Sequence, residues 1–486
     1  MKTPLVSLIP ALRNASRPTL GLAACVLLAT GCNRDDSATM PAASATTTVA
    51  DAVAADLLPA TPILSSHWAS GSLAGIAPDQ LASIVPIDRG RAMPGVSLGG
   101  GSFVKSNNPE SFGPNSAGAN NNGWLTQHAY THAGNGTAGD PARGGNNTWL
   151  SGNFQIYVSH YNKTGGSRHL QVILVNPQST ALTVSYRGAV TGSGDAGFNL
   201  GGGVTGRSNY YVTSERLLTL PTTMTSVTIP AGGAVALLAK QMNNGGSVDG
   251  TLYVSTPSTA PASGVYAYVV ATNTNALSEA VSLAHTPATR RAATGNIEKP
   301  VGTTAFGKEA GVYGFSKVTA DVPVPLPTSS GAHNLGIWVN FAGYTATPDQ
   351  PSIQTAPPQT NGSGQSLRLT DSALRTACNY NHEYNITFRL SNPSSTPRRV
   401  RIWFAAVRKS GRTLSFNSAM QFNNKGIFQV LTTDTSLKRE LTVVSPTNNA
   451  SAPITVPANG VLNVPARFFV AGLSSAGSQF MFETVD

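Results

Sequence analysis

Two short motifs in this 486-residue chain match glycine-containing patterns that carry chemistry in enzymes. Gly95-Val96-Ser97-Leu98-Gly99 fits G-x-S-x-G, in which a strained turn between a strand and a helix exposes a nucleophilic serine. Residues 192–197 fit G-x-G-x-x-G, in which the turn must open a helix whose N-terminus faces a pyrophosphate. Neither motif is followed by a helical pattern. We therefore expect a loop at each, without a nucleophile or a dinucleotide site.

Histidines at positions 128, 132, 160 and 169, with Asp140 nearby, raise the question of a metal site. His128 and His132 have the i, i+4 spacing of zinc ligands on a helix, but the adjacent glutamate and the helical pattern are missing. No pair of carboxylates suggests a glycosidase, and no calcium loop is present. The sequence predicts structural histidines, no metal, no cofactor and no catalytic residue. A metal site built from loops, or a hydrolase that uses His128, is the alternative.

Aromatic side chains offer a different chemistry, the stacking of sugars. Trp124 and Trp149 lie in Asn/Gly-rich segments, where they could form platforms for a carbohydrate. Trp338 and Trp403 lie in strand patterns and are expected in the core. We therefore predict Trp124 and Trp149 as the candidate ligand-binding residues.

The N-terminus has the layout of a secretory signal peptide. Lys2, Arg13 and Arg17 precede a short apolar run over residues 20–29, and small residues follow. The run Leu28-Ala29-Thr30-Gly31-Cys32 resembles the lipobox of bacterial lipoproteins. That resemblance implies cleavage after residue 31 and lipid attachment at Cys32, and Asn33 in the next position implies export to the outer membrane. Partners would be the membrane, through the lipid, and an envelope protein or glycan.

Cysteine usage agrees with this interpretation. Cys25 leaves with the signal and Cys32 takes the lipid, so Cys378 has no partner for an intrachain disulfide and is expected to be buried as a small hydrophobe. Removal of the leader leaves 29 basic and 22 acidic residues scattered along the chain. A nucleic-acid module would gather its basic residues on one element, so nucleic acid is not an expected partner.

Only 11% of the residues are charged, whereas Gly (49) and Pro (32) are abundant, which favours many short strands joined by turns. Within this pattern the chain contains a duplication. LQVILVNPQSTALTVSY (170–186) aligns with ITFRLSNPSSTPRRVRI (386–402), which matches Asn176-Pro177 with Asn392-Pro393. VTIPAGGAVALLAK (227–240) aligns with ITVPANGVLNVPAR (454–467). Each unit is predicted as strand, turn, strand, and the second alignment is interpreted as a hairpin with a primed turn at Gly232-Gly233 and Asn459-Gly460. Residues 156–158 and 337–339 form a weaker match.

We therefore predict an all-β fold of two tandem immunoglobulin-like antiparallel β-sandwich domains with very little helix. Short helices are expected at 78–85, at 276–285 with Asn275 as cap, and at 371–378. The expected layout is a leader (1–31), a flexible tether (32–60), a first sandwich (61–275), a linker with a short helix (276–300) and a second sandwich (301–486).

Several segments, among them SFVKSNNPESFGPNSAG (102–118), NFQIYVSHYNK (153–163) and EAGVYGFSKV (309–318), resemble an uncharacterised family of secreted all-β bacterial proteins with only a domain-of-unknown-function label. The resemblance implies the fold and the envelope address, and no activity. Our first hypothesis is a non-catalytic, lipid-anchored envelope protein with a structural, adhesive or assembly role. A carbohydrate-binding module is the second.

Overall fold

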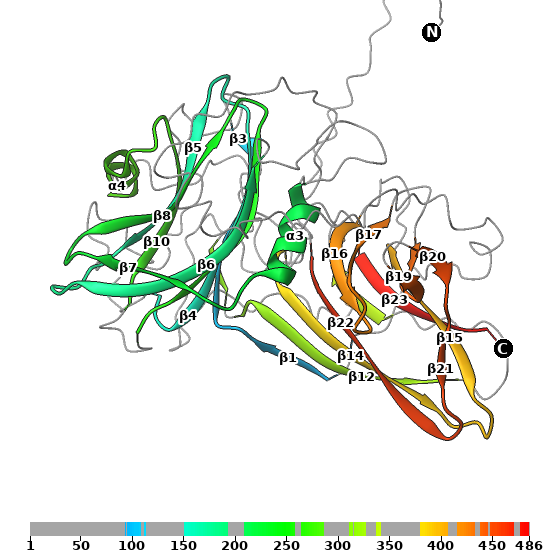
Figure 1. Cartoon of the computed structure of the whole chain (residues 1–486). Helices are drawn as coiled ribbons and strands as arrows, with labels where there is room; N and C mark the ends of the chain where they lie inside the picture. The colour runs from blue at the N-terminus through cyan, green and yellow to red at the C-terminus, as the bar shows by residue number, and fades with distance from the viewer. Residues whose placement is uncertain are drawn as a thin grey trace, which may run out of the picture.

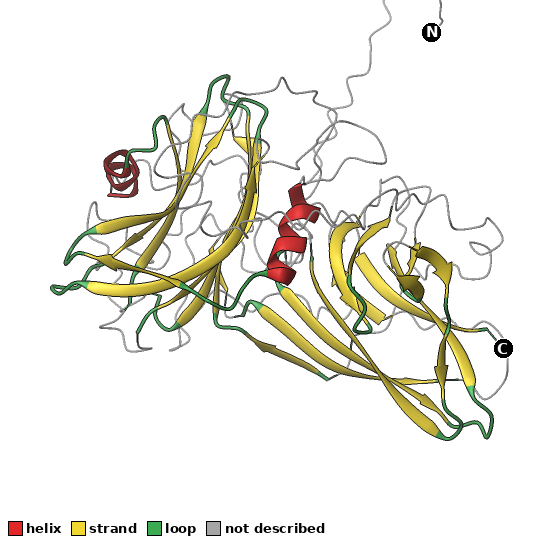
Figure 2. Cartoon of the chain, in the orientation of Figure 1, coloured by secondary structure: helices red, strands yellow, loops and turns green. Residues whose placement is uncertain are grey.

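A computed structural model describes residues 93, 95–107, 111–112, 150–192, 209–257, 264–285, 311–313, 315–326, 337–341, 380–406, 416–432, 438–445, 448–470 and 477–485. Over these ranges the chain is all-β with two β-sandwiches and little helix, as predicted (Figures 1 and 2). Three of the strand pairings within these ranges, residues 102–106 with 154–158, residues 111–112 with 161–162 and residues 317–325 with 383–391, are parallel, unlike the antiparallel sheets that we predicted. Neither of the two described helices is long and apolar enough to cross a membrane. The leader, the tether, Cys32 and Cys378 lie outside the described residues.

The first sandwich consists of two sheets around one apolar core. Sheet I has the order β11-β2-β4-β9-β6-β7, with the short β3 also paired to β4, and sheet II has the order β10-β5-β8. Alternate residues of their strands, such as Ile156, Val172 and Leu252, are fully buried between the two sheets. The strands are β2 (Ser102–Ser106), β3 (Ser111–Phe112), β4 (Asn153–Asn162), β5 (Arg168–Val175), β6 (Leu182–Gly192), β7 (Thr225–Ile229), β8 (Ala234–Met242), β9 (Ser247–Ser255), β10 (Tyr266–Thr272) and β11 (Gly311–Tyr313).

The second sandwich has the same two-layer plan with a core rich in phenylalanine. Sheet III has the order β1-β12-β14-β22-β16-β17, and sheet IV has the order β13-β23-β15-β18, with β21 also paired to β15. The rings of Phe388, Phe404, Phe468 and Phe480 lie with centroids 4.7–6.1 Å apart between the sheets. The strands are β1 (Val96–Gly99), β12 (Lys317–Pro325), β13 (Ile337–Phe341), β14 (Glu383–Asn392), β15 (Arg398–Ala406), β16 (Phe416–Phe422), β17 (Ile427–Thr432), β18 (Lys438–Glu440), β21 (Ile454–Val456), β22 (Gly460–Phe469) and β23 (Gly477–Thr484), with a hairpin of β19 (Val443–Ser445) and β20 (Asn448–Ser451) beside them.

The predicted duplication is confirmed by equivalent strand pairings. β5 pairs with β8 in the first sandwich as β14 pairs with β22 in the second. Likewise β6 pairs with β7 and β9, and β15 pairs with β21 and β23. The weaker match holds as well, since β4 pairs with β9 as β13 pairs with β23.

An asparagine holds the corresponding loops of both sandwiches in the same way. Asn176 Nδ2 donates to the carbonyls of Thr180, Ile229 and Pro230 at 2.8, 3.2 and 3.0 Å. Asn392 Nδ2 repeats this with the carbonyls of Thr396, Val456 and Pro457 at 2.8, 3.3 and 3.0 Å. The side-chain oxygen Oδ1 of each asparagine accepts the backbone N–H two residues further along the chain. Each asparagine therefore ties together the two loops that the sequence alignments identified.

The predicted hairpins at residues 227–240 and 454–467 are wrong. β7 and β8 belong to different sheets, as do β21 and β22, so each tight turn carries the chain from one sheet to the other. Only the third turn residue has positive φ, Gly232 at 61° and Asn459 at 52°, as in a type II turn rather than a primed one. The reason is that the asparagine amides bind the carbonyls at the start of these turns and hold them against the loops that follow β5 and β14.

Strands from opposite sides of the predicted linker (residues 276–300) pair with each other. β1, which precedes the first sandwich in the chain, pairs with β12 of sheet III, and β11 pairs with β2 of sheet I. The crossing from β1 to β2 occurs at Gly100 and Gly101, whose φ values are 83° and 82°. A Cβ at Gly101 would lie 2.1 Å from the carbonyl oxygen of Asn153, so only glycine fits there. The two sandwiches are therefore joined by exchanged edge strands.

Helix α3 (Asn209–Thr219), which the sequence did not predict, lies between the sandwiches (Figure 1). Tyr211 and Leu217 pack in one cluster with Ala189 of sheet I and Phe469 of sheet III. One of its buried polar side chains bonds across the interface: Ser214 Oγ accepts the N–H of Ala419 at 2.8 Å. The helix thus fills the junction between the two sandwiches.

Helix α4 (Leu277–His285) confirms the helix predicted at 276–285. It packs on the outer face of sheet II through Ala280 and Ala284, so it is part of the first sandwich. Its start differs from the prediction of an Asn275 cap, because the Glu279 carboxylate accepts the N–H groups of Asn273 and Thr274 at 2.8 and 3.0 Å. Burial raises the pKa of Glu279, but these hydrogen bonds outweigh burial and lower its pKa overall.

Candidate functional site

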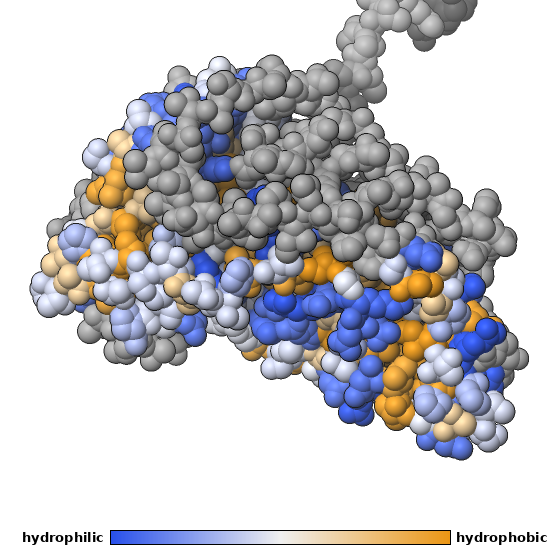
Figure 3. Space-filling view, in the orientation of Figure 1, coloured by the Kyte–Doolittle hydropathy of each residue, from blue (hydrophilic) through white to orange (hydrophobic). Residues whose placement is uncertain are grey.

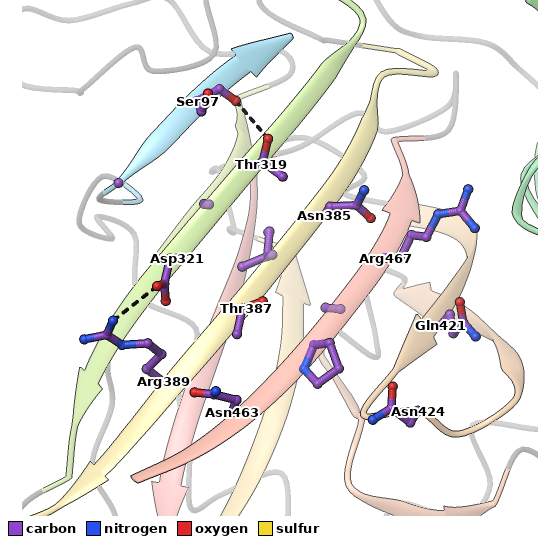
Figure 4. Close-up of a pocket in the computed structure, with 15 residues that line it drawn as sticks. Ser97, Thr319, Asp321, Asn385, Thr387, Arg389, Gln421, Asn424, Asn463 and Arg467 are labelled. Carbon is purple, nitrogen blue, oxygen red and sulfur yellow. Dashed lines mark hydrogen bonds and ion pairs between the residues drawn. The ribbon is translucent and has the colours of Figure 1, made fainter. Parts of the chain in front are cut away.

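An open trough of about 670 Å³ lies on the outer face of sheet III. Figure 3 shows hydrophilic side chains gathered over these strands. The trough is lined by ten polar side chains from β1, β12, β14, β22, β16 and the turn after β16 (Figure 4): Ser97, Thr319, Asp321, Asn385, Thr387, Arg389, Gln421, Asn424, Asn463 and Arg467. Pro465 adds an apolar surface in the middle. This arrangement presents many hydrogen-bonding groups to a ligand that approaches from solvent.

The register of the strands orders these side chains into rows across the sheet. Ser97 pairs with Thr319, Thr319 with Asn385, Asn385 with Arg467, and Arg467 with Gln421. These five residues form the polar row. The neighbouring row contains Asp321, Thr387 and Pro465. The strands are about 4.8 Å apart, so the polar row is roughly 19 Å long.

Several lining side chains have hydrogen-bonding groups that the protein does not use. Within the part of the chain that the structure describes, the side chains of Ser97, Thr387, Gln421, Asn424 and Asn463 make no hydrogen bond to protein. They are exposed or half-buried and are held by strands or a tight turn. Because their backbone is already held, a ligand that binds these unpaired groups has to order only the side chains.

Charges in the trough occur as pairs. Arg389 lies 3.2 Å from Asp321, with both side chains about half exposed. Arg467 Nε donates to Glu383 Oε1 at 2.8 Å, and Glu383 is largely buried. Lys317, just beyond the polar row, lies 3.8 Å from the same carboxylate. Each of these cations is therefore close to a carboxylate, and Arg467 and Lys317 share the one of Glu383.

One end of the trough is supported by the first sandwich. Arg467 also donates to the carbonyl of Leu218 at the end of α3, at 3.1 Å. Arg187 of β6 donates to the carbonyl of Leu220, at 3.4 Å, and stacks on Tyr253. Two arginines from opposite sandwiches therefore lie at the C-terminal end of α3, where a positive charge is favourable. Burial, with the nearby Glu383 carboxylate, raises the pKa of Tyr253 well above its ordinary value.

The motifs considered in the sequence have other roles. Ser97 does not lie in a loop or an elbow, because residues 96–99 form the edge strand β1, and Ser97 lines the trough. His160 is buried in sheet I and bonds Ser106 Oγ at 2.7 Å, whereas His169 lies on β5 of sheet II, near the Glu279 carboxylate of α4. No group of three or more possible metal ligands occurs among the residues that the structure describes. His128, His132, Trp124 and Trp149 lie outside those residues.

Trp403 is fully buried, as its strand pattern predicted. It lies on β15, where Nε1 donates to Glu483 at 3.0 Å, and the Lys438 ammonium lies 4.5 Å from the centre of its ring. Burial lowers the pKa of Lys438 to about 8, against the effect of the nearby Glu483 and Glu440 carboxylates. This cluster belongs to sheet IV and is separate from the trough.

Comparisons with known proteins provide no family for the chain. No protein-family model matches it, and no curated protein matches at a significant level. Among solved structures, the N-terminal CBM22-1-CBM22-2 tandem domain of Paenibacillus barcinonensis Xyn10C is similar at 8% identity, over 68% of this chain and 82% of that one, with a TM-score of 0.12. This likeness is too low to carry an argument. The function must therefore be argued from the trough itself.

Proposed function

We propose that this chain is a non-catalytic, lipid-anchored protein of the bacterial cell envelope that adheres to a carbohydrate through the trough on sheet III. The supporting observation is the row of hydroxyl, amide and guanidinium groups across the strands. Sugars present hydroxyls that both donate and accept hydrogen bonds, and amide and hydroxyl side chains match both roles. Pro465 offers an apolar surface to the C–H face of a sugar ring.

The proposal of a binding role without catalysis rests on the chemistry of this lining. Hydrolysis of a glycosidic bond uses two carboxyl groups on either side of the bond. The described lining contains a single carboxylate, Asp321, and this is paired with Arg389. We propose that the lining groups recognise a ligand and leave it unchanged.

The cellular location is also part of the proposal. Cys32 would carry the lipid, and residues 32–60 would hold the sandwiches away from the outer membrane. Trp124 and Trp149 keep their predicted role as stacking residues for sugars. Replacing Cys32 with serine is expected to release the protein from membrane fractions into the soluble fraction, and persistent membrane association would contradict the anchor.

A glycan array tests the carbohydrate-binding role. We expect selective binding by the wild type and its loss in the double variant Asn385→Ala/Thr387→Ala. The double variant Thr183→Ala/Ser185→Ala is the matched control, because these side chains lie on the exposed face of β6 in the first sandwich. The proposal fails if no glycan is bound, or if the trough variant binds as well as the control.

A purely structural role in the envelope is the second candidate. The exchanged strands β1 and β11, together with α3, favour it because they join the two sandwiches into one unit. Crosslinking of the lipidated protein in cells would support this role if it captured an envelope protein through the first sandwich while glycan binding was absent.

A further inference from the structure

We infer that the ligand is an uncharged oligosaccharide that lies across the strands, along the polar row from Ser97 to Gln421. This inference rests on the proposed carbohydrate-binding function and specifies its ligand.

The charge follows from the ion pairs. The Arg389 guanidinium lies 3.2 Å from Asp321 and that of Arg467 lies 2.8 Å from Glu383. An acidic sugar would have to displace a carboxylate from an arginine and would then lie beside that carboxylate. Exposed pairs such as Arg389–Asp321 are weak and can rearrange, but the Asp321 carboxylate stays at the site and repels an anion. An uncharged sugar can bond to both members of a pair without separating them.

The direction follows from the register. Five polar side chains on five neighbouring strands follow one another along the polar row, over roughly 19 Å. A ligand aligned with β14 instead would meet Asn385, Thr387 and Arg389, and the last of these lies in a third row beside Asn463. A ligand that runs across the strands can contact all five side chains of the polar row and place a ring face near Pro465 in the next row, whereas one along β14 follows only Asn385 of that row.

The middle of the polar row is preorganised and its ends are unpaired. Asn385 Nδ2 and Arg467 Nε both donate to Glu383 Oε1, at 3.2 and 2.8 Å, so the buried carboxylate fixes both side chains. Ser97 and Gln421, at the two ends, make no side-chain hydrogen bond within the described protein. Fixed groups reduce the entropy lost on binding, and unpaired groups gain new bonds.

Affinity electrophoresis of the mature wild-type protein tests both the charge and the direction of the ligand. The native gels contain either a neutral polysaccharide (a glucan, a mannan or a galactan) or an acidic one (polygalacturonate or alginate), all at 0.15 M salt to screen the positive surface (about 8 Å Debye length). We expect retardation by a neutral polysaccharide and none by the acidic ones. Gln421→Ala and Asn385→Ala should each weaken binding about tenfold, as expected for the loss of one or two hydrogen bonds. Arg389→Ala, off the polar row, should weaken binding clearly less than Gln421→Ala does, and Thr183→Ala on the first sandwich should leave it unchanged.

The outcomes separate this inference from the proposed function. Retardation by an acidic polysaccharide that Gln421→Ala abolishes would keep the carbohydrate-binding role and overturn the uncharged ligand. An equal loss from Arg389→Ala and Gln421→Ala would overturn the direction. No retardation by any polysaccharide would overturn the proposed function as well. Circular dichroism of each variant, with Thr183→Ala as the control, excludes loss of folding as the cause.

Discussion

Replacing Asn392 with alanine should strongly destabilise the second sandwich. The side chain is 2% exposed. It donates to three backbone carbonyls, of Thr396, Val456 and Pro457, and accepts the N–H of Ser394 at 3.0 Å. A typical hydrogen bond contributes about 1 kcal/mol net, and a buried carbonyl left unpaired costs about 1–3 kcal/mol. Because two amide protons serve three acceptors, we count two strong bonds and one weak bond on the donor side. The expected loss is about 3 kcal/mol.

Because the unit is duplicated, the stability contributed by this asparagine can be measured a second time, in the first sandwich. Asn176 makes the corresponding bonds in the first sandwich and is fully buried. Asn176→Ala should therefore destabilise the first sandwich by a similar amount. Asn392→Asp should cost more than alanine at neutral pH, because a carboxylate would face the same carbonyl oxygens without a proton to donate. Asn463→Ala, at an exposed asparagine of β22, is the control and should cost less than about 0.5 kcal/mol.

Urea unfolding followed by circular dichroism and by tryptophan fluorescence would give the free energies. Buried Trp403 reports on the second sandwich, next to β23. If Asn392→Ala costs less than about 1 kcal/mol, or if aspartate is tolerated as well as asparagine, the loops are not held by this side chain. Other contacts would then hold the crossings between sheets in both sandwiches.

Two further predictions concern buried charge and the junction. Lys438→Met should stabilise the protein at pH 7 by about 1–2 kcal/mol, since burial lowers the lysine pKa to about 8 and the charged form is disfavoured in the folded state. The wild type should accordingly gain stability as the pH rises from about 8 towards about 10.4, the lysine pKa in the unfolded chain. The methionine variant should not, and thermal unfolding across this pH range would show the difference. Gly101→Ala should lower the free energy of unfolding by about 2–4 kcal/mol because its Cβ would collide with a backbone carbonyl. Normal stability of this variant by urea unfolding would contradict the crossing geometry, and Gly165→Ala, with positive φ but open space, is its matched control.

The duplicated units were predictable because their causes are local. An Asn-Pro step ends a strand and fixes the next loop through its own side chain, so two copies of the pattern have the same structure. The partner of each strand is a non-local property. The turns at Gly232 and Asn459 look like hairpin turns in sequence, but the asparagine amides from another loop decide that the chain changes sheet there.

Helix α3 and the trough escaped prediction for related reasons. The helix is rich in tyrosine, valine, threonine and serine, which are weak helix formers, and it is stabilised by burial against both sandwiches rather than by its own propensity. Thr319 and Asp321 alternate with buried valine and alanine, which marks one open face of β12. The sequence does not tell which strands lie beside β12, and the trough exists only once β1, β14, β22 and β16 are aligned with it.

The trough depends on the whole chain rather than on the second sandwich alone. Ser97 reaches it on β1, from a segment that precedes the first sandwich. At its other end Arg467 is held by Glu383 and by the Leu218 carbonyl of α3, which packs against sheet I. A fragment that begins at residue 301 would lose β1 and α3 together, and with them one wall of the trough and one support of the polar row. The proposed binding at the trough would therefore be coupled to the junction between the sandwiches, which gives a physical reason for two duplicated domains to exchange strands.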